Sequence, residues 1–452
     1  MTNRVISLLT KPGPLLAAGL GIASAAGSLF LATVNRTITP ADVAALSGLY
    51  FLLATVGTGV LAGLEQEMTR TVSRSLADGT SPGAAVRQQL RQAAGLAAAT
   101  VALMGVTAPF IVHHWCAGHW YLYFELLVGL LGTWAAYLIR GLLSGYRDFR
   151  LYAVNLSVEG LSRLVPSLVI ALLGVGSTWS FGLCYALGPG ISAVVGIALF
   201  SRAHGHKLSS LSRPAARPAD AAAVSSTRRA VSNLVYLTVA TLASQVLMNG
   251  LPLAVVPRLA SDAAVGAAVA SAIGLTRLAL LTLFPLQAPL LPKLTAAATL
   301  HKFGEVRRTT ARLVGAVSGI GLVVTVGTAA IGPWVLTHVM GTKASLSAVF
   351  LGSLALGTML LMVAFVLQSA LIALNRHVIV FAAWTLGVVA MFVAFALPIG
   401  ALAAGELASL IGPGAVIALE LPDAILRTRR QPDAAGTPAA GDLSEQAPVA
   451  AQ

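Results

Sequence analysis

Residues 345–374 read SLSAVFLGSLALGTMLLMVAFVLQSALIAL, a run that contains no charged side chain. At 1.5 Å per residue, about twenty helical residues cross a hydrocarbon layer of ~30 Å. A run of this length and composition therefore predicts a membrane-spanning helix. Similar runs recur along the whole chain, which indicates a multi-pass, all-α membrane protein.

Working outward from this run, we place about twelve transmembrane helices. The first six spans are expected near 15–34, 43–64, 93–112, 122–143, 151–174 and 178–200, and the last six near 231–255, 264–288, 311–333, 345–374, 378–400 and 403–421. This order predicts an N-terminal six-helix lobe over 1–200, a cytoplasmic linker over 201–230, a C-terminal six-helix lobe over 231–421 and a disordered cytoplasmic tail over 422–452.

The bulk composition excludes a soluble protein. Hydrophobic residues make up 57% of the 452 residues and charged residues 10%, whereas a soluble domain carries about 25% charged residues. The net charge of +13 is typical of nucleic-acid binding, but the basic residues lie in short loops between apolar runs. That placement follows the positive-inside rule, so no nucleic-acid partner is expected.

The distribution of lysine and arginine predicts the orientation in the membrane. Of the 29 basic residues, 24 lie at the N-terminus, in alternate loops, in the linker or in the tail, all on one side of the predicted bundle. This count includes Arg140, assigned to the connection after the fourth span. Only Arg36, Arg258 and Lys343 lie on the other side. Both termini are therefore expected in the cytoplasm.

The two halves of the chain resemble each other at an offset of 222 residues. At this offset Leu31–Arg36 (LATVNR) aligns with Leu253–Arg258 (LAVVPR). Because the offset spans six helices, both halves insert with the same orientation. Parallel repeats of this kind place a substrate site in a central cavity between two lobes.

Two short stretches carry a resemblance to a known family. Residues 35–43 read NRTITPADV after the first span, and residues 63–70 read GLEQEMTR at the end of the second. These stretches, with LQAPLLP at 286–292, resemble the polysaccharide flippases of the multidrug/oligosaccharidyl-lipid/polysaccharide exporter superfamily. The resemblance implies a transporter that moves a lipid-linked oligosaccharide across the membrane. The glycine that usually follows the acidic residue of the turn is missing here, since Val43 follows Asp42.

Charged residues inside predicted spans are the best candidates for a binding site, because each is costly in hydrocarbon and commonly faces a wet cavity. Arg163 lies roughly 18 Å into the fifth span, and Glu159 precedes it by four residues on the same helix face. The two readings are a substrate-binding group and a structural ion pair. Pro166 favours a kink beside them.

In the second lobe, Arg277 lies about 20 Å into the eighth span with no acidic residue within four positions. Its partner is expected from another helix, from a cavity or from an anionic ligand. Asn249 and Gln287 add polar groups to neighbouring spans. The prolines of this lobe favour broken or bent helices. Arg277, Arg163, Glu159, Gln287 and Asn249 are thus the candidate substrate-binding residues.

No enzyme motif, metal-binding cluster or cofactor-binding loop is evident, so neither a catalytic nor a metal site is expected. The leading hypothesis is a flippase for a lipid-linked oligosaccharide or polysaccharide precursor in a bacterial inner membrane, with membrane lipids and a possible coupling ion as further partners. One alternative is an ion-coupled antiporter for drugs or organic cations, although the first span (15–34) has no acidic residue. A second alternative is a membrane-embedded glycan polymerase or glycosyltransferase.

Overall fold

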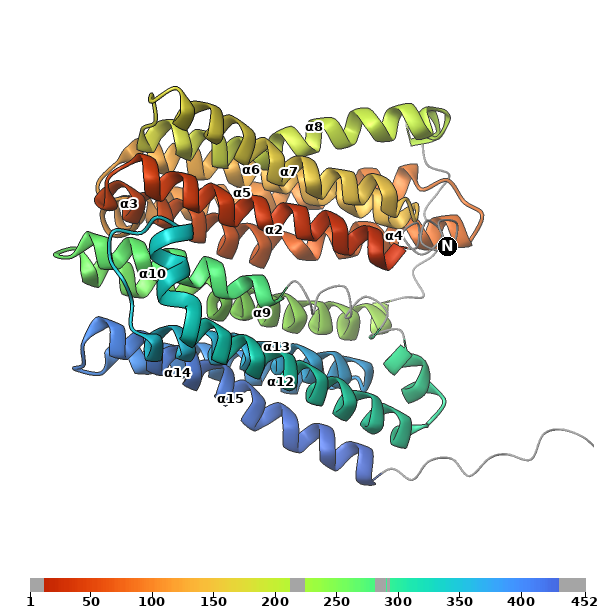
Figure 1. Ribbon diagram of the computed structural model, residues 1–452. Coiled ribbons are helices and arrows are strands. Elements are labelled where there is room, and N and C mark those ends of the chain that lie inside the picture. Colours follow the sequence, from red (N-terminus) through yellow and green to blue (C-terminus); the bar gives the residue numbers. More distant parts are fainter. Residues whose placement is uncertain (1–11, 212–223, 281–289, 291–292, 431–452) are drawn as a thin grey trace, which may run out of the picture.

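The computed structural model describes residues 12–211, 224–280, 290 and 293–430, and every regular element among them is a helix (Figure 1). The first half comprises α2 (Pro12–Thr37), α3 (Pro40–Leu52), the π-helix η1 (Leu53–Thr58), α4 (Gly59–Ala77), α5 (Gly83–Trp115), α6 (Trp120–Gly145), α7 (Phe149–Leu172) and α8 (Thr178–Leu211). The second half comprises α9 (Val224–Val255), the 3₁₀ helix η2 (Val256–Leu259), α10 (Ala263–Thr276), the 3₁₀ helix η3 (Arg277–Ala279), α12 (Phe303–Trp334), the π-helix η4 (Val335–Val339), α13 (Ala348–Ala373), α14 (His377–Ala396) and α15 (Ala401–Arg430).

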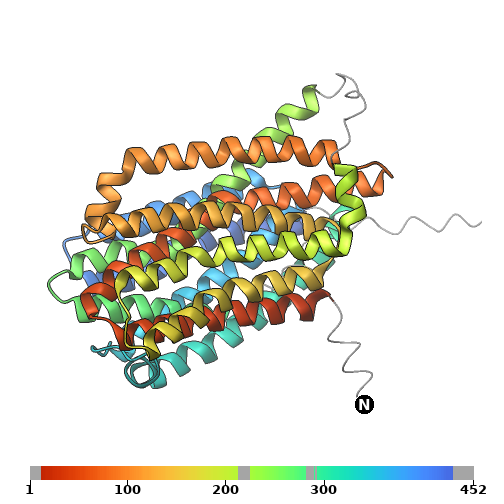
Figure 2. The same cartoon turned by 90° about the horizontal axis from the view of Figure 1, so that it is seen from above.

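The helices form two lobes. In Figure 1, α2 to α8 make up one layer and α9 to α15 the other, and Figure 2 shows the helices running roughly side by side along one axis. The beginning of α2, the end of α8, the beginning of α9 and the end of α15 lie at the same end of the bundle. The basic loops belong to this end, which the positive-inside rule predicts to be cytoplasmic.

Eleven helices among the described residues are long and apolar enough to cross a membrane, which agrees with the predicted multi-pass architecture. The uncharged run 345–374 forms α13. The expected eighth span, 264–288, begins as the shorter apolar helix α10, and most of its second half lies outside the described residues. The α-helix ends at Thr276, so Arg277 lies at a helix break and not within a regular span.

Two predicted boundaries differ from the structure. Helix α8 continues to Leu211 and α9 begins at Val224, so both ends of the expected linker 201–230 are helical. Helix α15 continues through Pro422 to Arg430, past the expected end at residue 421. A proline removes a single N–H donor from the helix. Here Asp423 accepts two hydrogen bonds from Arg376 (2.9 and 2.8 Å), which fixes the following turn against the loop after α13.

The turn that carried the family resemblance is a helix start. Thr39 caps α3: its hydroxyl donates to Asp42 Oδ2 (2.6 Å) and accepts from the Asp42 backbone N–H (3.3 Å). Pro40 occupies the first turn, where its missing N–H is not needed. Asp42 Oδ1 also accepts from Thr178 (2.7 Å), which joins the start of α3 to the start of α8.

The lobes are joined at the end opposite to the termini. Asn35 at the end of α2 donates to Ser271 Oγ in α10 (2.8 Å), and both residues are buried. Arg36 donates to the carbonyl of His338 (2.6 Å), and the Trp115 indole donates to the carbonyl of Leu253 (2.8 Å). These three hydrogen bonds hold the outer ends of the lobes together.

Candidate functional site

A cavity of about 620 Å³ lies between the lobes. Helices α2, α3, α4, α6, α7 and α8 line it together with η1, and the second lobe contributes Gly274, Arg277 and Leu278. The lining runs from Tyr50 and Gly27 in the middle of the bundle to Gly13 and Ser144 near the cytoplasmic end. The cavity volume falls within the roughly 300–1,000 Å³ of small-molecule sites.

Helical periodicity brings the polar residues of α6 to the cavity. Thr133, Tyr137, Arg140 and Ser144 are spaced by four, three and four residues, and all four line the cavity. This spacing places them along one face of a helix with 3.6 residues per turn. The face explains why Arg140, which the sequence assigned to a cytoplasmic connection, is buried in the bundle. The assignment of Arg140 to a cytoplasmic connection was wrong, because the positive-inside rule considers only where a basic residue lies along the chain. It takes no account of whether the side chain points into the bundle or into water.

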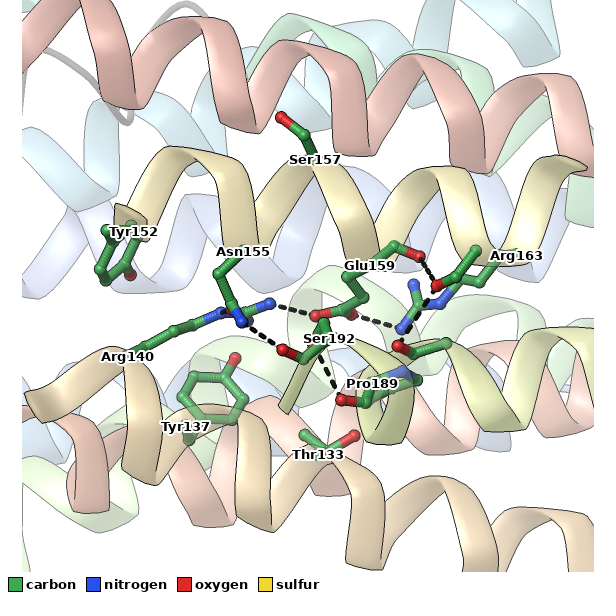
Figure 3. Close-up of polar contacts among 12 residues, drawn as sticks. Thr133, Tyr137, Arg140, Tyr152, Asn155, Ser157, Glu159, Arg163, Pro189 and Ser192 are labelled. Atoms are coloured by element: carbon green, nitrogen blue, oxygen red, sulfur yellow. Dashed lines mark hydrogen bonds and ion pairs between the residues drawn. The ribbon is translucent and has the colours of Figure 1, made fainter. Parts of the chain in front are cut away.

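Three charged side chains form a buried network on the cavity wall (Figure 3). Arg163 donates to Glu159 Oε1 (2.5 Å), which confirms the predicted pair one helical turn apart. Arg140 of α6 donates to the other oxygen, Oε2. One carboxylate therefore bridges two guanidinium groups from neighbouring helices.

Asn155 of α7 holds this network in place. Its Oδ1 accepts from Arg140 Nε (2.8 Å), and its amide donates to the carbonyl of Ser192 in α8 (2.6 Å). Asn155 is fully buried, and it joins α6, α7 and α8 in one chain of hydrogen bonds (Figure 3). Buried polar groups need such partners, because an unsatisfied donor or acceptor in this setting is costly.

Aromatic rings pack against the inner end of the network. The Arg163 guanidinium lies 4.4 Å from the centre of the Tyr185 ring, and the Tyr50 ring lies 4.8 Å from that of Tyr185. A cation over an aromatic face is attracted by the negative face of the ring. Gly188 makes room for this arrangement, since a Cβ there would lie 2.8 Å from Arg163 Nε.

Glu65 adds a second carboxylate to the wall. The Tyr152 hydroxyl donates to its Oε1 (2.6 Å), and both residues line the cavity. Glu65 differs in this from its neighbour in the sequence, because Glu67 pairs with Arg70 at the exposed edge of α4 while Glu65 lines the cavity.

Arg277 faces the cavity from the other lobe. Its Nε and Nη1 are buried and have no hydrogen-bond partner among the residues that the structure describes. No carboxylate of the described ranges forms an ion pair with it. The break between α10 and η3 places this side chain at the boundary between the lobes.

The structure brings three of the five sequence-predicted site residues together: Glu159, Arg163 and Arg277 all line the cavity. Asn249 does not belong to this lining; it is buried in α9 and donates to Gln245 Oε1 (3.1 Å) on its own helix. Gln287 lies outside the described residues. Within the part of the chain that the structure describes, no group of three or more His, Cys, Asp or Glu is arranged to hold a metal ion.

The described lining carries three arginines, Arg140, Arg163 and Arg277, against two glutamates, Glu65 and Glu159. The formal balance is therefore positive when all five groups are ionised. Two of the arginines share one carboxylate, and the third has none. This cavity can offer hydrogen-bond donors to an anion, and its arginines can bind the oxygens of a phosphate in pairs.

The π-helix η1 adds to the shape of the site. It interrupts the second span at Leu53–Thr58, and Leu53, Ala54 and Thr58 line the cavity. Single π-helical turns within α-helices are frequent at functional sites. The extra residue of the π turn shifts the helix face, so the groups on either side of η1 face different neighbours.

Comparison with protein-family models and with curated protein sequences found no match. Solved structures do match along nearly the whole chain. An inward-facing multidrug resistance MATE family transporter of the MOP superfamily is 11% identical with a TM-score of 0.71, covering 93% of this chain and 96% of its own. A Vibrio cholerae MATE transporter is 16% identical with a TM-score of 0.64, covering 93% and 98%. An outward-facing MATE family transporter is 13% identical with a TM-score of 0.66, covering 94% and 98%. The chain therefore has the two-lobed fold of MATE transporters, as the sequence resemblance implied at the level of the superfamily.

Proposed function

We propose that this protein is a transporter that carries an anionic amphiphile across a bacterial inner membrane, and that a lipid-linked oligosaccharide or polysaccharide precursor is its substrate. The observation that carries the proposal is Arg277, a cavity-facing arginine with no partner among the described residues. A charged group at the centre of a membrane helix costs at least ~2.5 kcal/mol even on lenient insertion scales. An anionic ligand would offset that cost.

The positions of the arginines suit a phosphate group held between the lobes. Arg163 extends from the first lobe and Arg277 from the second, and both line the cavity. Arginine binds phosphate oxygens through a planar fork of donors. The tyrosine and threonine side chains around the cavity add the hydroxyl groups and rings that a sugar headgroup requires, while a lipid tail would remain in the bilayer.

An antiporter for drugs or organic cations is the second candidate. It is favoured by the fold, because two of the similar structures are described as multidrug resistance transporters. The charges of the cavity oppose it, since a cationic substrate would meet three arginines and only two carboxylates. In addition, α2 (Pro12–Thr37) contains no acidic residue that faces the cavity.

Binding of defined probes separates the two candidates. Purified protein in detergent would be titrated with farnesyl diphosphate, with uncharged farnesol and with tetraphenylphosphonium, a lipophilic cation. We expect farnesyl diphosphate to bind at least about tenfold more tightly than either other probe, because charge complementarity selects among amphiphiles of similar hydrophobicity. Tighter binding of the cation would instead establish the antiporter.

The contribution of Arg277 is measured with Arg277→Ala, Arg277→Lys and the control Arg308→Ala. Arg308 is exposed near the start of α12 and does not belong to the cavity lining. Arg277→Ala should weaken diphosphate binding about tenfold or more, in line with loss of a charge-assisted hydrogen bond worth roughly 1.5–3 kcal/mol. Arg277→Lys should restore it in part, and Arg308→Ala should bind normally. Normal binding by Arg277→Ala at matched folding would show that the arginine has a structural role.

A further inference from the structure

We propose that Glu159 is an internal counter-anion: in the empty cavity its carboxylate binds Arg140 and Arg163, and the anionic group of the substrate displaces it from Arg163. This inference rests on the proposed function, since it requires that the cavity binds an anion. It assigns to Glu159 the control of how tightly the substrate is held and how readily it is released.

The Glu159 carboxylate bridges the two arginines as a phosphate group would. Each oxygen of the Glu159 carboxylate accepts from a different arginine, Oε1 from Arg163 and Oε2 from Arg140. A phosphate group offers the same kind of bridge, with separate oxygens for separate guanidinium groups. The carboxylate thus takes up donors that an incoming phosphate would use.

The network is accessible from the cavity. Glu159, Arg140 and Arg163 all line the cavity, with side-chain exposures of 17%, 7% and 16%. A ligand in the cavity can therefore reach the network without any movement of a helix. Glu159 and Arg163 are also one turn apart on α7, so their ion pair can break and form again by side-chain rotation alone.

The two arginines differ in their other hydrogen-bond partners. Arg140 has a second partner, because its Nε donates to Asn155. Arg163 Nε is buried with no hydrogen-bond partner in the described part of the chain. Arg140 is therefore held in place by Asn155, whereas the Nε donor of Arg163 is not used by any described residue. When substrate enters, Arg163 is the group that can transfer its hydrogen bonds, while Glu159 remains neutralised by Arg140.

The consequence for transport follows from the charges. With Glu159 ionised, the network of three residues carries one net positive charge, and without it two. A carrier must bind its substrate and then release it, so a site of higher positive charge would bind an anion more tightly but turn over more slowly. Glu159 keeps the site at the lower charge.

The test is the substitution Glu159→Gln, which preserves shape and removes the charge. Binding of farnesyl diphosphate should tighten by about tenfold, since a neighbouring opposite charge no longer competes for the arginines. Flipping of a fluorescent short-chain polyprenyl diphosphate in liposomes should become slower. The opposite directions of the two effects are diagnostic, because structural damage would weaken both binding and flipping. The control is Glu67→Gln, which removes a carboxylate paired with Arg70 outside the cavity lining, and it should change neither.

A second variant covers the case in which Glu159→Gln does not accumulate. The double substitution Glu159→Gln with Arg140→Gln removes one charge of each sign, so the network keeps one net positive charge and Arg163 has no competitor. If Glu159 competes for Arg163, this variant binds the diphosphate more tightly than the wild type at equal net charge. Binding no tighter than the wild type, or failure of both variants to fold, would show that the carboxylate is structural and overturn the inference.

The outcomes also separate this inference from the proposed function. If the wild type binds farnesyl diphosphate no better than farnesol, the proposed function is wrong. If the wild type binds the diphosphate selectively while Glu159→Gln binds equally or less tightly, the proposed function stands and the counter-anion is excluded.

Discussion

At the scale of single residues, Asn155 has the most demanding structural task in the first lobe. Its side chain satisfies Arg140 Nε and the Ser192 carbonyl at the same time, within a fully buried setting. Asn155→Ala would leave the buried Arg140 Nε without this partner and would break the link to α8, and an unsatisfied buried group costs about 1–3 kcal/mol. We therefore expect a clear loss of thermal stability in detergent, measured by the unfolding midpoint of the purified protein.

The matched control for that experiment is Ser157→Ala on the same helix. The Ser157 hydroxyl donates to the Ala153 carbonyl within α7, and in Figure 3 it points away from the network. Its removal should leave the unfolding midpoint nearly unchanged. Equal midpoints for Asn155→Ala and the wild type would mean that neighbouring groups replace the lost hydrogen bonds.

The residues of the site were predictable from the sequence only in part. The spacing of Glu159 and Arg163 within one span gives their pairing directly, because residues four apart share a helix face. Arg140 was missed because its depth suggests a cytoplasmic connection. The signal that identifies it is the polar stripe Thr133, Tyr137, Arg140 and Ser144, whose spacing follows the helical repeat. Partners on other helices, such as Ser192, are set by tertiary packing and have no local signal.

At the scale of elements, the breaks in the helices determine how the lobes meet. The prolines of the second lobe predicted broken or bent helices, and α9 does pass into the 3₁₀ helix η2 at Pro257. The break at Arg277 has no proline of its own, since the nearest one after it is Pro285. Sequence reasoning therefore placed Arg277 within a regular span, although the structure places it at a helix end.

The outer contact between α2 and α10 should control which end of the cavity is open. Asn35→Ala removes the hydrogen bond to Ser271, whose hydroxyl still donates to the Ala267 carbonyl (2.9 Å). Interhelical hydrogen bonds in membranes contribute about 0.6 kcal/mol on average, which corresponds to a shift of about threefold in the ratio of outward-open to inward-open protein. We expect the outward-open population to rise accordingly.

This shift can be measured at Leu31, which is buried on α2 and in contact range of Gly274 in α10. A cysteine introduced by Leu31→Cys, with Cys116 and Cys184 replaced by serine, would be labelled from outside by a membrane-impermeant maleimide. Adding Asn35→Ala should speed the labelling, and adding Thr33→Ala should not, because the Thr33 hydroxyl bonds only within α2 to Leu29. Equal labelling rates for the Asn35→Ala and Thr33→Ala variants would show that this hydrogen bond does not help to close the outer end of the cavity.

At the scale of the whole molecule, the predicted orientation and the observed cavity together determine from which side the substrate enters. The lining of the cavity reaches Gly13 and Ser144, at the end of the bundle where both described ends of the chain lie. Charge counting predicts that this end is cytoplasmic, because most of the basic residues are expected on this side. At the opposite end, Asn35, Arg36 and Trp115 close the lobes against each other. With this predicted orientation, the cavity would open toward the cytoplasm, the side on which the proposed substrate would be loaded.

Two introduced cysteines test this orientation in the same cysteine-free background. Ser144→Cys lies on the cytoplasmic part of the cavity wall, and Ser177→Cys lies in the exposed loop before α8 at the outer end. An impermeant maleimide should label Ser144→Cys in inside-out vesicles and Ser177→Cys in right-side-out vesicles. Farnesyl diphosphate should slow the labelling of Ser144→Cys alone, because only that position faces the proposed binding site.

If both positions reverse their sidedness, the orientation from charge counting is wrong. If Ser177→Cys behaves as expected while Ser144→Cys is labelled only from outside, the orientation stands and the protein rests in the outward-open state. If Ser144→Cys is labelled from the cytoplasm and the diphosphate gives no protection, the cavity is open to the cytoplasm but does not bind the anion.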